Sequence, residues 1–109
     1  MLPHKVKIKP KVWYSIVWVD KFDDGDVRGY CDFDAKQIVI TREISQTLAY
    51  KTFIHEFLHA IEFEYSLKFP HPLIYALEEH LYYIFKNNFS LTKFIKTISK
   101  KPIVKKKRR

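Results

Sequence analysis

The spacing of the apolar residues changes once along this chain, near Ser45, and this change limits the fold more than any other feature. Before Ser45 the β-branched and aromatic residues form short runs, and such runs are typical of strands. The predicted strands are residues 4–9, 11–19, 27–33 and 37–41. Only the turn Asp34-Ala35-Lys36 separates the last two, so we expect them to form an antiparallel hairpin.

After Ser45 the apolar residues recur every three or four positions, which predicts helices. Ser45 suits the N-cap of a helix that continues to about Ser66, and a second helix is predicted from about Pro72 to Asn87. A third, short helix is predicted over residues 91–99. Strands followed by helices predict an α+β fold, here a small antiparallel sheet of three or four strands followed by two or three helices.

The net charge of +8 is concentrated at the C-terminal end of the chain. Residues 91–109 contain nine Lys or Arg residues and no acidic residue, whereas the other 90 residues contain 11 basic and 12 acidic residues. We therefore expect a single near-neutral domain over residues 1–99 and a disordered basic tail over residues 100–109. The tail predicts non-specific contact with nucleic acids, although a purely solubilising extension would have the same composition.

Cys31 is the only cysteine, so the chain cannot form an internal disulfide. The lysine-rich start of the chain does not resemble a signal peptide, and there is no run of about 18 apolar residues that would predict a membrane helix. These features predict a soluble protein that does not interact with membranes. The absence of a possible disulfide predicts the cytoplasm, which is a reducing compartment.

The first predicted helix contains the sequence His55-Glu56-Phe57-Leu58-His59. Residues four positions apart lie on the same face of a helix, so both imidazoles can reach one metal ion. Zinc accepts nitrogen ligands, and a catalytic zinc site keeps one position for water. Glu56 is rotated by about 100° from His55 around the helix axis, and from there its carboxylate would accept a proton from that water as general base.

Residues 52–62, Thr-Phe-Ile-His-Glu-Phe-Leu-His-Ala-Ile-Glu, resemble the active-site helix of the zincin metallopeptidases. The short chain and the strand hairpin before this helix resemble the small SprT-like and ImmA/IrrE-like zincin domains of prokaryotes and phages. The resemblance implies Zn²⁺ as the cofactor, His55 and His59 as zinc ligands and Glu56 as the catalytic base. It also implies an endopeptidase whose protein or peptide substrate pairs with the edge of the sheet as an extra strand.

Two histidines do not complete a catalytic zinc site, so a third ligand is needed. The glycine and third histidine that metzincins have after the motif are missing here, whereas gluzincins use a glutamate from the next helix. The phase of the second predicted helix places Glu79 in water and puts Glu78 and His80 on the two flanks of its apolar face. Similarity to gluzincins favours Glu78 as the third ligand, with His80 and His71, the latter on a loop between two prolines, as alternatives.

Other polar residues near the motif have two interpretations each. Glu62 lies three positions after His59 and would accept a hydrogen bond from it, or would be an ordinary surface acid. Tyr65, Tyr82 and Tyr83 each suit the stabilisation of an oxyanion, although tyrosines at helical spacing more often serve packing.

A second function from another class is compatible with the same residues. It is a non-catalytic, zinc-containing domain, a degenerate zincin, that binds nucleic acid or protein. Glu56 distinguishes the two functions, because a structural zinc site is closed by four protein ligands and has no use for a base.

Overall fold

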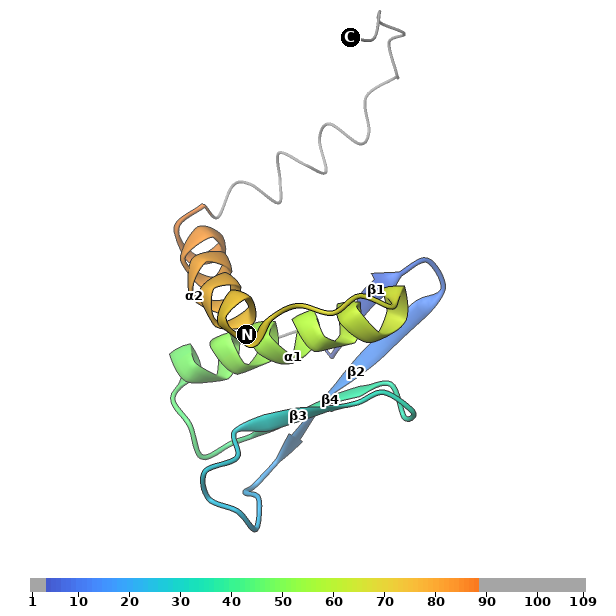
Figure 1. Cartoon of the computed structure of the whole chain (residues 1–109). Helices are drawn as coiled ribbons and strands as arrows, with labels where there is room; N and C mark the ends of the chain where they lie inside the picture. Colours follow the sequence, from blue (N-terminus) through green and yellow to red (C-terminus); the bar gives the residue numbers. More distant parts are fainter. Residues whose placement is uncertain (1–3, 89–109) are drawn as a thin grey trace, which may run out of the picture.

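The computed structural model describes residues 4–88, which form a four-stranded sheet followed by two helices (Figure 1). The elements are β1 (Lys5–Lys9), β2 (Val12–Val19), β3 (Gly29–Asp32), β4 (Gln37–Thr41), α1 (Gln46–Tyr65) and α2 (His71–Asn87). The predicted α+β class is confirmed. The helix predicted over residues 91–99 and the tail over residues 100–109 lie outside the described residues. Within residues 4–88, neither helix combines the length and the apolar character of a membrane span.

The sheet is mixed, with the strand order β1-β2-β4-β3. β1 pairs antiparallel with β2, and β3 and β4 form the predicted antiparallel hairpin. β2 and β4 are parallel, so the prediction of a purely antiparallel sheet is wrong. The reason is that the chain leaves β2, skips one strand position to form β3, and returns as β4 between them. β3 therefore forms one edge of the described sheet.

One face of this sheet is covered by α1 (Figure 1). The core between them consists of buried residues from β2, β4 and α1, namely Tyr14, Ile16, Ile38, Ile40, Ala49 and Ala60. The strand residues alternate in sequence, as expected for one face of a pleated sheet, and the alanines allow the helix to lie close to it. Ser45 caps α1 as predicted, since its hydroxyl accepts a hydrogen bond from the backbone N–H of Leu48.

The edge strand lies so close to α1 that a glycine is required at the contact. A Cβ atom at Gly29 would lie 2.7 Å from the Thr52 Cγ2 atom and 2.7 Å from the carbonyl oxygen of Val39. Any side chain at this position would push β3 away from the helix. Because Thr52 precedes Glu56 by about one helical turn, Gly29 holds the edge of the sheet beside the motif.

The second helix packs on another side of α1, through a separate small core of Ile54, Leu58 and Ile74. It begins at His71, one residue earlier than predicted, so His71 lies in the first turn of α2 and its predicted position in a loop is wrong. Pro72 is compatible with this start, because backbone N–H groups in the first helical turn have no partner within the helix.

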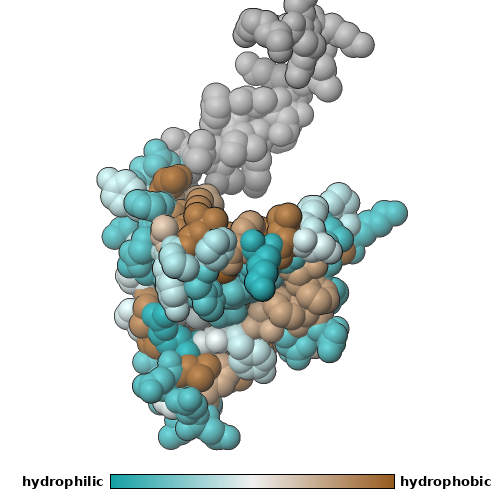
Figure 2. Space-filling model, in the orientation of Figure 1, coloured by the Kyte–Doolittle hydropathy of each residue, from teal (hydrophilic) through white to brown (hydrophobic). Residues whose placement is uncertain are grey.

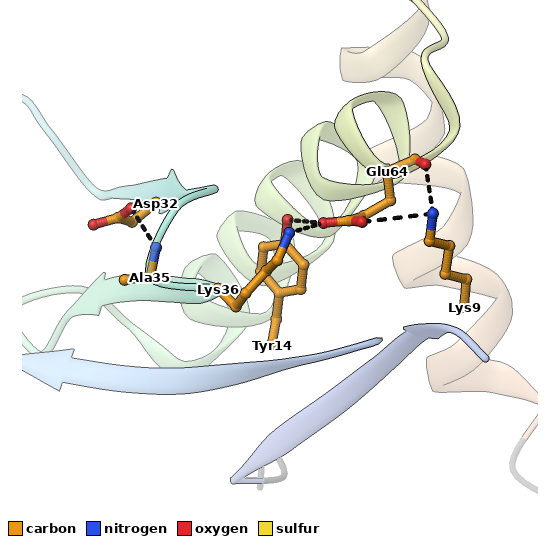
Figure 3. Close-up of polar contacts among 6 residues, drawn as sticks. All are labelled: Lys9, Tyr14, Asp32, Ala35, Lys36 and Glu64. Carbon is orange, nitrogen blue, oxygen red and sulfur yellow. Dashed lines mark hydrogen bonds and ion pairs between the residues drawn. The ribbon is translucent and has the colours of Figure 1, made fainter. Parts of the chain in front are cut away.

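The C-terminal part of α1 is fastened to the sheet through Glu64 (Figure 3). The Glu64 carboxylate accepts hydrogen bonds from the Tyr14 hydroxyl, at 2.7 Å, and from the Lys36 ammonium group, and it lies 3.7 Å from the Lys9 Nζ atom. The Glu64 side chain is only 7% exposed. The hydrogen bond from Lys36, followed by that from Tyr14, lowers the pKa of Glu64. Glu64 is therefore a charged structural group at the end of α1.

Candidate metal centre

The two motif histidines lie on the strip of α1 between the face that packs on the sheet and the face that packs on α2. Their side chains are 15% exposed for His55 and 25% exposed for His59, so each ring is mostly buried but reaches the surface. The two Nε2 atoms are 3.2 Å apart. Two nitrogen ligands of a tetrahedral zinc ion are separated by about 3.3 Å, because each Zn–N bond is about 2.0–2.1 Å long. The spacing of the histidines therefore fits a shared zinc ion.

A carboxylate lies at the Nδ1 atom of each ring, on the side away from the other histidine. The Nδ1 atom of His55 lies 2.8 Å from Glu78 Oε1, and the Nδ1 atom of His59 lies 2.6 Å from Glu62 Oε1. An ionised carboxylate can only accept hydrogen bonds, so each Nδ1–H donates to its carboxylate and each Nε2 atom is directed at the other ring. Two imidazole nitrogens 3.2 Å apart need a cation between them, either a shared proton or a metal ion bound by both lone pairs.

A third imidazole, that of His71 on α2, lies close to the His55–His59 pair. The ligand atoms of His55, His59 and His71 all lie within 4.8 Å of one another. The His71 ring centre is 5.9 Å from that of His55 and 5.5 Å from that of His59. His71 is exposed, so its ring has room to rotate toward the pair. Three imidazole nitrogens are a donor set that zinc accepts, with one tetrahedral position left over.

The structure places the three predicted third ligands differently. Glu78, predicted on one flank of the apolar face, is 5% exposed, but it contacts His55 Nδ1, on the side of the ring away from His59. His80 is exposed and does not belong to the histidine cluster. His71, the alternative from the supposed loop, is the one that joins the cluster. Glu78 thus orients a histidine, and His71 is the better placed to complete the ligand set.

Glu56 is the second buried carboxylate near the histidines, and its situation is unlike that of Glu78. Glu56 is 9% exposed, yet its carboxylate has no hydrogen-bonding partner within the described part of the chain. No fully enclosed side-chain oxygen or nitrogen atom in residues 4–88 lacks a partner, so the oxygens of Glu56 must touch solvent. Burial raises the pKa of Glu56, and the nearby Glu78 adds to the rise, while His55 and His59 oppose it. A carboxylate of raised pKa that is open to water suits a general base.

Glu62 links the motif to the segment that leads into α2. One of its oxygens accepts the hydrogen bond from His59, the first of the two interpretations of this residue, and the other accepts one from the backbone N–H of Phe69, at 2.6 Å. Desolvation acts in the opposite direction, but these two hydrogen bonds lower the pKa of Glu62. Because His71 follows Phe69 by two residues, Glu62 helps to set the position of the third imidazole.

The sequence did not point to Tyr75, which lies beside the cluster. Its ring centre is 5.3 Å from that of His55 and 5.6 Å from that of His71. The three tyrosines considered for oxyanion stabilisation make other contacts: Lys9 lies over the Tyr65 ring, the Tyr82 hydroxyl donates a hydrogen bond to Thr47, and Tyr83 is 66% exposed. Tyr75 follows His71 by four positions, so it becomes recognisable only once His71 is placed on α2.

Comparison of the chain with protein-family models, with curated proteins and with solved structures finds no match. Function must therefore be inferred from the side chains of the histidine cluster and from their surroundings.

Proposed function

We propose that this chain is a zinc-dependent metallopeptidase of the zincin type, in which His55, His59 and His71 hold the metal ion. The observation that carries the proposal is the facing pair of Nε2 atoms, 3.2 Å apart, with a carboxylate at each opposite nitrogen. Carboxylates behind both rings fix the orientation that a metal ion requires.

The chain's own residues supply the remaining parts of a hydrolytic site. Zinc, when bound, would lower the pKa of water toward about 7 and polarise the carbonyl group to be attacked. Glu56 would accept the proton of the attacking water and later deliver it to the leaving amine. β3 lies at the edge of the described sheet beside α1, where an extended peptide can add as a further strand.

Glu56 favours this enzymatic function over a non-catalytic zinc domain. A structural zinc site would be closed by a fourth protein ligand, whereas Glu56, the carboxylate within the motif, makes no hydrogen bond in residues 4–88. A buried, partnerless carboxylate costs stability, and its role as a base gives a reason to retain it. A cytoplasmic location and contact of residues 100–109 with nucleic acids are further parts of the proposal, and they are supported by the single cysteine and by the basic composition of the tail.

The test is hydrolysis of an unfolded protein by the full-length chain, loaded with one equivalent of zinc. Three proteins are compared: the wild type, Glu56→Gln, and Glu43→Gln as a matched control at an exposed glutamate. We expect Glu56→Gln to bind zinc as tightly as the wild type but to lose at least about a hundredfold in cleavage rate, the usual contribution of a general base. Glu43→Gln should cleave normally. Equal cleavage by wild type and Glu56→Gln would contradict the mechanism, and failure of the wild type to bind zinc would contradict the metal centre.

A further inference from the structure

A stacked pair of phenylalanines lies next to the histidine cluster. The rings of Phe33 and Phe63 are 4.6 Å apart and nearly parallel, with an angle of 9° between their planes. Phe63 nevertheless remains 50% exposed. Figure 2 shows an apolar patch on this side of the molecule, beside the C-terminal half of α1. Exposed apolar patches of this kind often mark a place where another molecule binds.

The pair lies on the line that a peptide paired with β3 would follow. Phe63 follows His59 by four positions, so it lies about 6 Å further along the same side of α1. In β3, Gly29 packs closely against Thr52, and the thiol of Cys31 lies near enough to Glu56 to feel its charge. Phe33, directly after β3, stacks on Phe63. The edge strand and the helix therefore run side by side past the metal centre toward the phenylalanine pair.

The rise along α1 from His59 to Phe63 matches one or two residues of an extended substrate. Successive residues of an extended chain are about 3.3 Å apart, so a step of about 6 Å corresponds to roughly two residues. A peptide paired with the edge of β3, with its scissile bond at the histidines, would place a side chain one or two positions away on the Phe33–Phe63 pair.

The positive charge of Lys36 beside the phenylalanine pair is neutralised by Glu64, and this indicates which substrate side chains the pair would bind. The Lys36 ammonium group lies 5.1 Å from the centre of the Phe63 ring, but it is paired with the Glu64 carboxylate (Figure 3). An acidic substrate side chain would have to compete with Glu64 for Lys36. A large apolar side chain would instead be attracted by the exposed aromatic surface without competing for any charge.

We propose that Phe33 and Phe63 form the subsite that selects the substrate, and that it accepts a large apolar side chain, aromatic or aliphatic, one or two residues from the cleaved bond. This inference rests on the metallopeptidase function proposed above, which supplies the reaction whose selectivity it describes.

The experiment is a cleavage profile of the zinc-loaded, full-length protein on a mixture of peptides from digested proteins, read by mass spectrometry. The variants are Phe63→Ser, Phe63→Leu, and Phe85→Ser as a matched control, because Phe85 is also exposed, at 59%, but lies on α2 near its C-terminal end. We expect the wild type to favour Phe, Tyr, Leu or Met over Ala at one position by at least about tenfold in kcat/KM, as apolar subsites typically do. Phe63→Ser should reduce this ratio to about 1, and Phe63→Leu should lower the preference for aromatic over aliphatic residues.

The outcomes separate this inference from the function on which it rests. Failure of the wild type to cleave any peptide would contradict the peptidase function, and the subsite with it. Cleavage without an apolar preference near the cut, or with a preference that Phe63→Ser leaves unchanged, would contradict the subsite alone. A change as large in Phe85→Ser as in Phe63→Ser would also overturn it, because the effect would then not depend on the neighbourhood of the histidines. Zinc content and thermal unfolding, measured for every variant, exclude loss of the metal or of the fold as the cause.

Discussion

Replacement of His71 and of Glu78 by alanine should weaken zinc binding by very different amounts. The structure places His71 beside the His55–His59 pair and Glu78 on the far side of His55, with a hydrogen bond of 2.8 Å to its Nδ1 atom. A structural zinc site with four ligands binds with about 10–16 kcal/mol, which corresponds to roughly 2.5–4 kcal/mol for each ligand. The loss of His71 should therefore raise the zinc dissociation constant by two to three orders of magnitude, since about 1.4 kcal/mol corresponds to a factor of ten.

The loss of Glu78 removes an orienting hydrogen bond and no bond to the metal. Such losses typically cost about 10–100-fold in metal affinity. Glu78→Gln, which keeps an oxygen that can accept the hydrogen bond from His55, should lose less than Glu78→Ala. His80→Ala is the matched control, because His80 is an exposed histidine of the same helix outside the cluster, and its dissociation constant should equal that of the wild type.

The assay is a competition titration with a chromophoric zinc chelator at constant pH, carried out on all four variants and the wild type. A larger loss in Glu78→Ala than in His71→Ala would refute this assignment and would make Glu78 the third ligand, as similarity to gluzincins suggests. Equal affinities of His71→Ala and His80→Ala would refute the role of His71 independently.

Three further predictions concern the metal-free protein. The hydrogen bond from Lys36 lowers the pKa of Glu64 in the folded state, so the ionised carboxylate stabilises the fold above the unfolded pKa of about 4.3. This contribution is lost as the pH falls through the folded pKa. Glu64→Gln should therefore lower the free energy of unfolding by about 1–3 kcal/mol at pH 7, and urea titrations should show this difference shrinking below pH 4. Gly29→Ala should lower the free energy of unfolding by about 1–3 kcal/mol, because β3 lies in close contact with α1. Gly25→Ala adds a Cβ with no atom within 4 Å and should change this free energy by less than about 0.5 kcal/mol. Equal effects of the two variants in urea titrations would refute the contact. Burial raises the pKa of Cys31 to about 12, so iodoacetamide at pH 8 should alkylate the folded protein about a thousandfold more slowly than the unfolded chain; comparable rates would show that the thiol is not held as the structure has it.

The amino-acid sequence alone determined the local part of the candidate site. His55 and His59 share a helix face because the helix has 3.6 residues per turn, and neither distant contacts nor the rest of the fold can change that spacing. The same spacing made the contact of Glu62 with His59, three positions earlier, one of two interpretations of Glu62, and the residue type of Ser45 predicted the N-cap. The α+β class followed from the periodicity of the apolar residues, because strands and helices bury alternate faces at different periods.

The tertiary structure decided what joins these parts. The pairing of β2 with β4 depends on the path of the chain between β2 and β3, and no local pattern records that path. Helix phase placed Glu78 and His80 on the two flanks of the apolar face, but it could not tell that only Glu78 would be buried or which nitrogen of His55 its carboxylate would meet. The angle and the starting residue of α2 determine that His71 reaches the histidine pair and that Glu78 lies behind it. Both follow from the packing of Ile54, Leu58 and Ile74 and from the hydrogen bond of Glu62 to Phe69, contacts between residues that the sequence keeps apart.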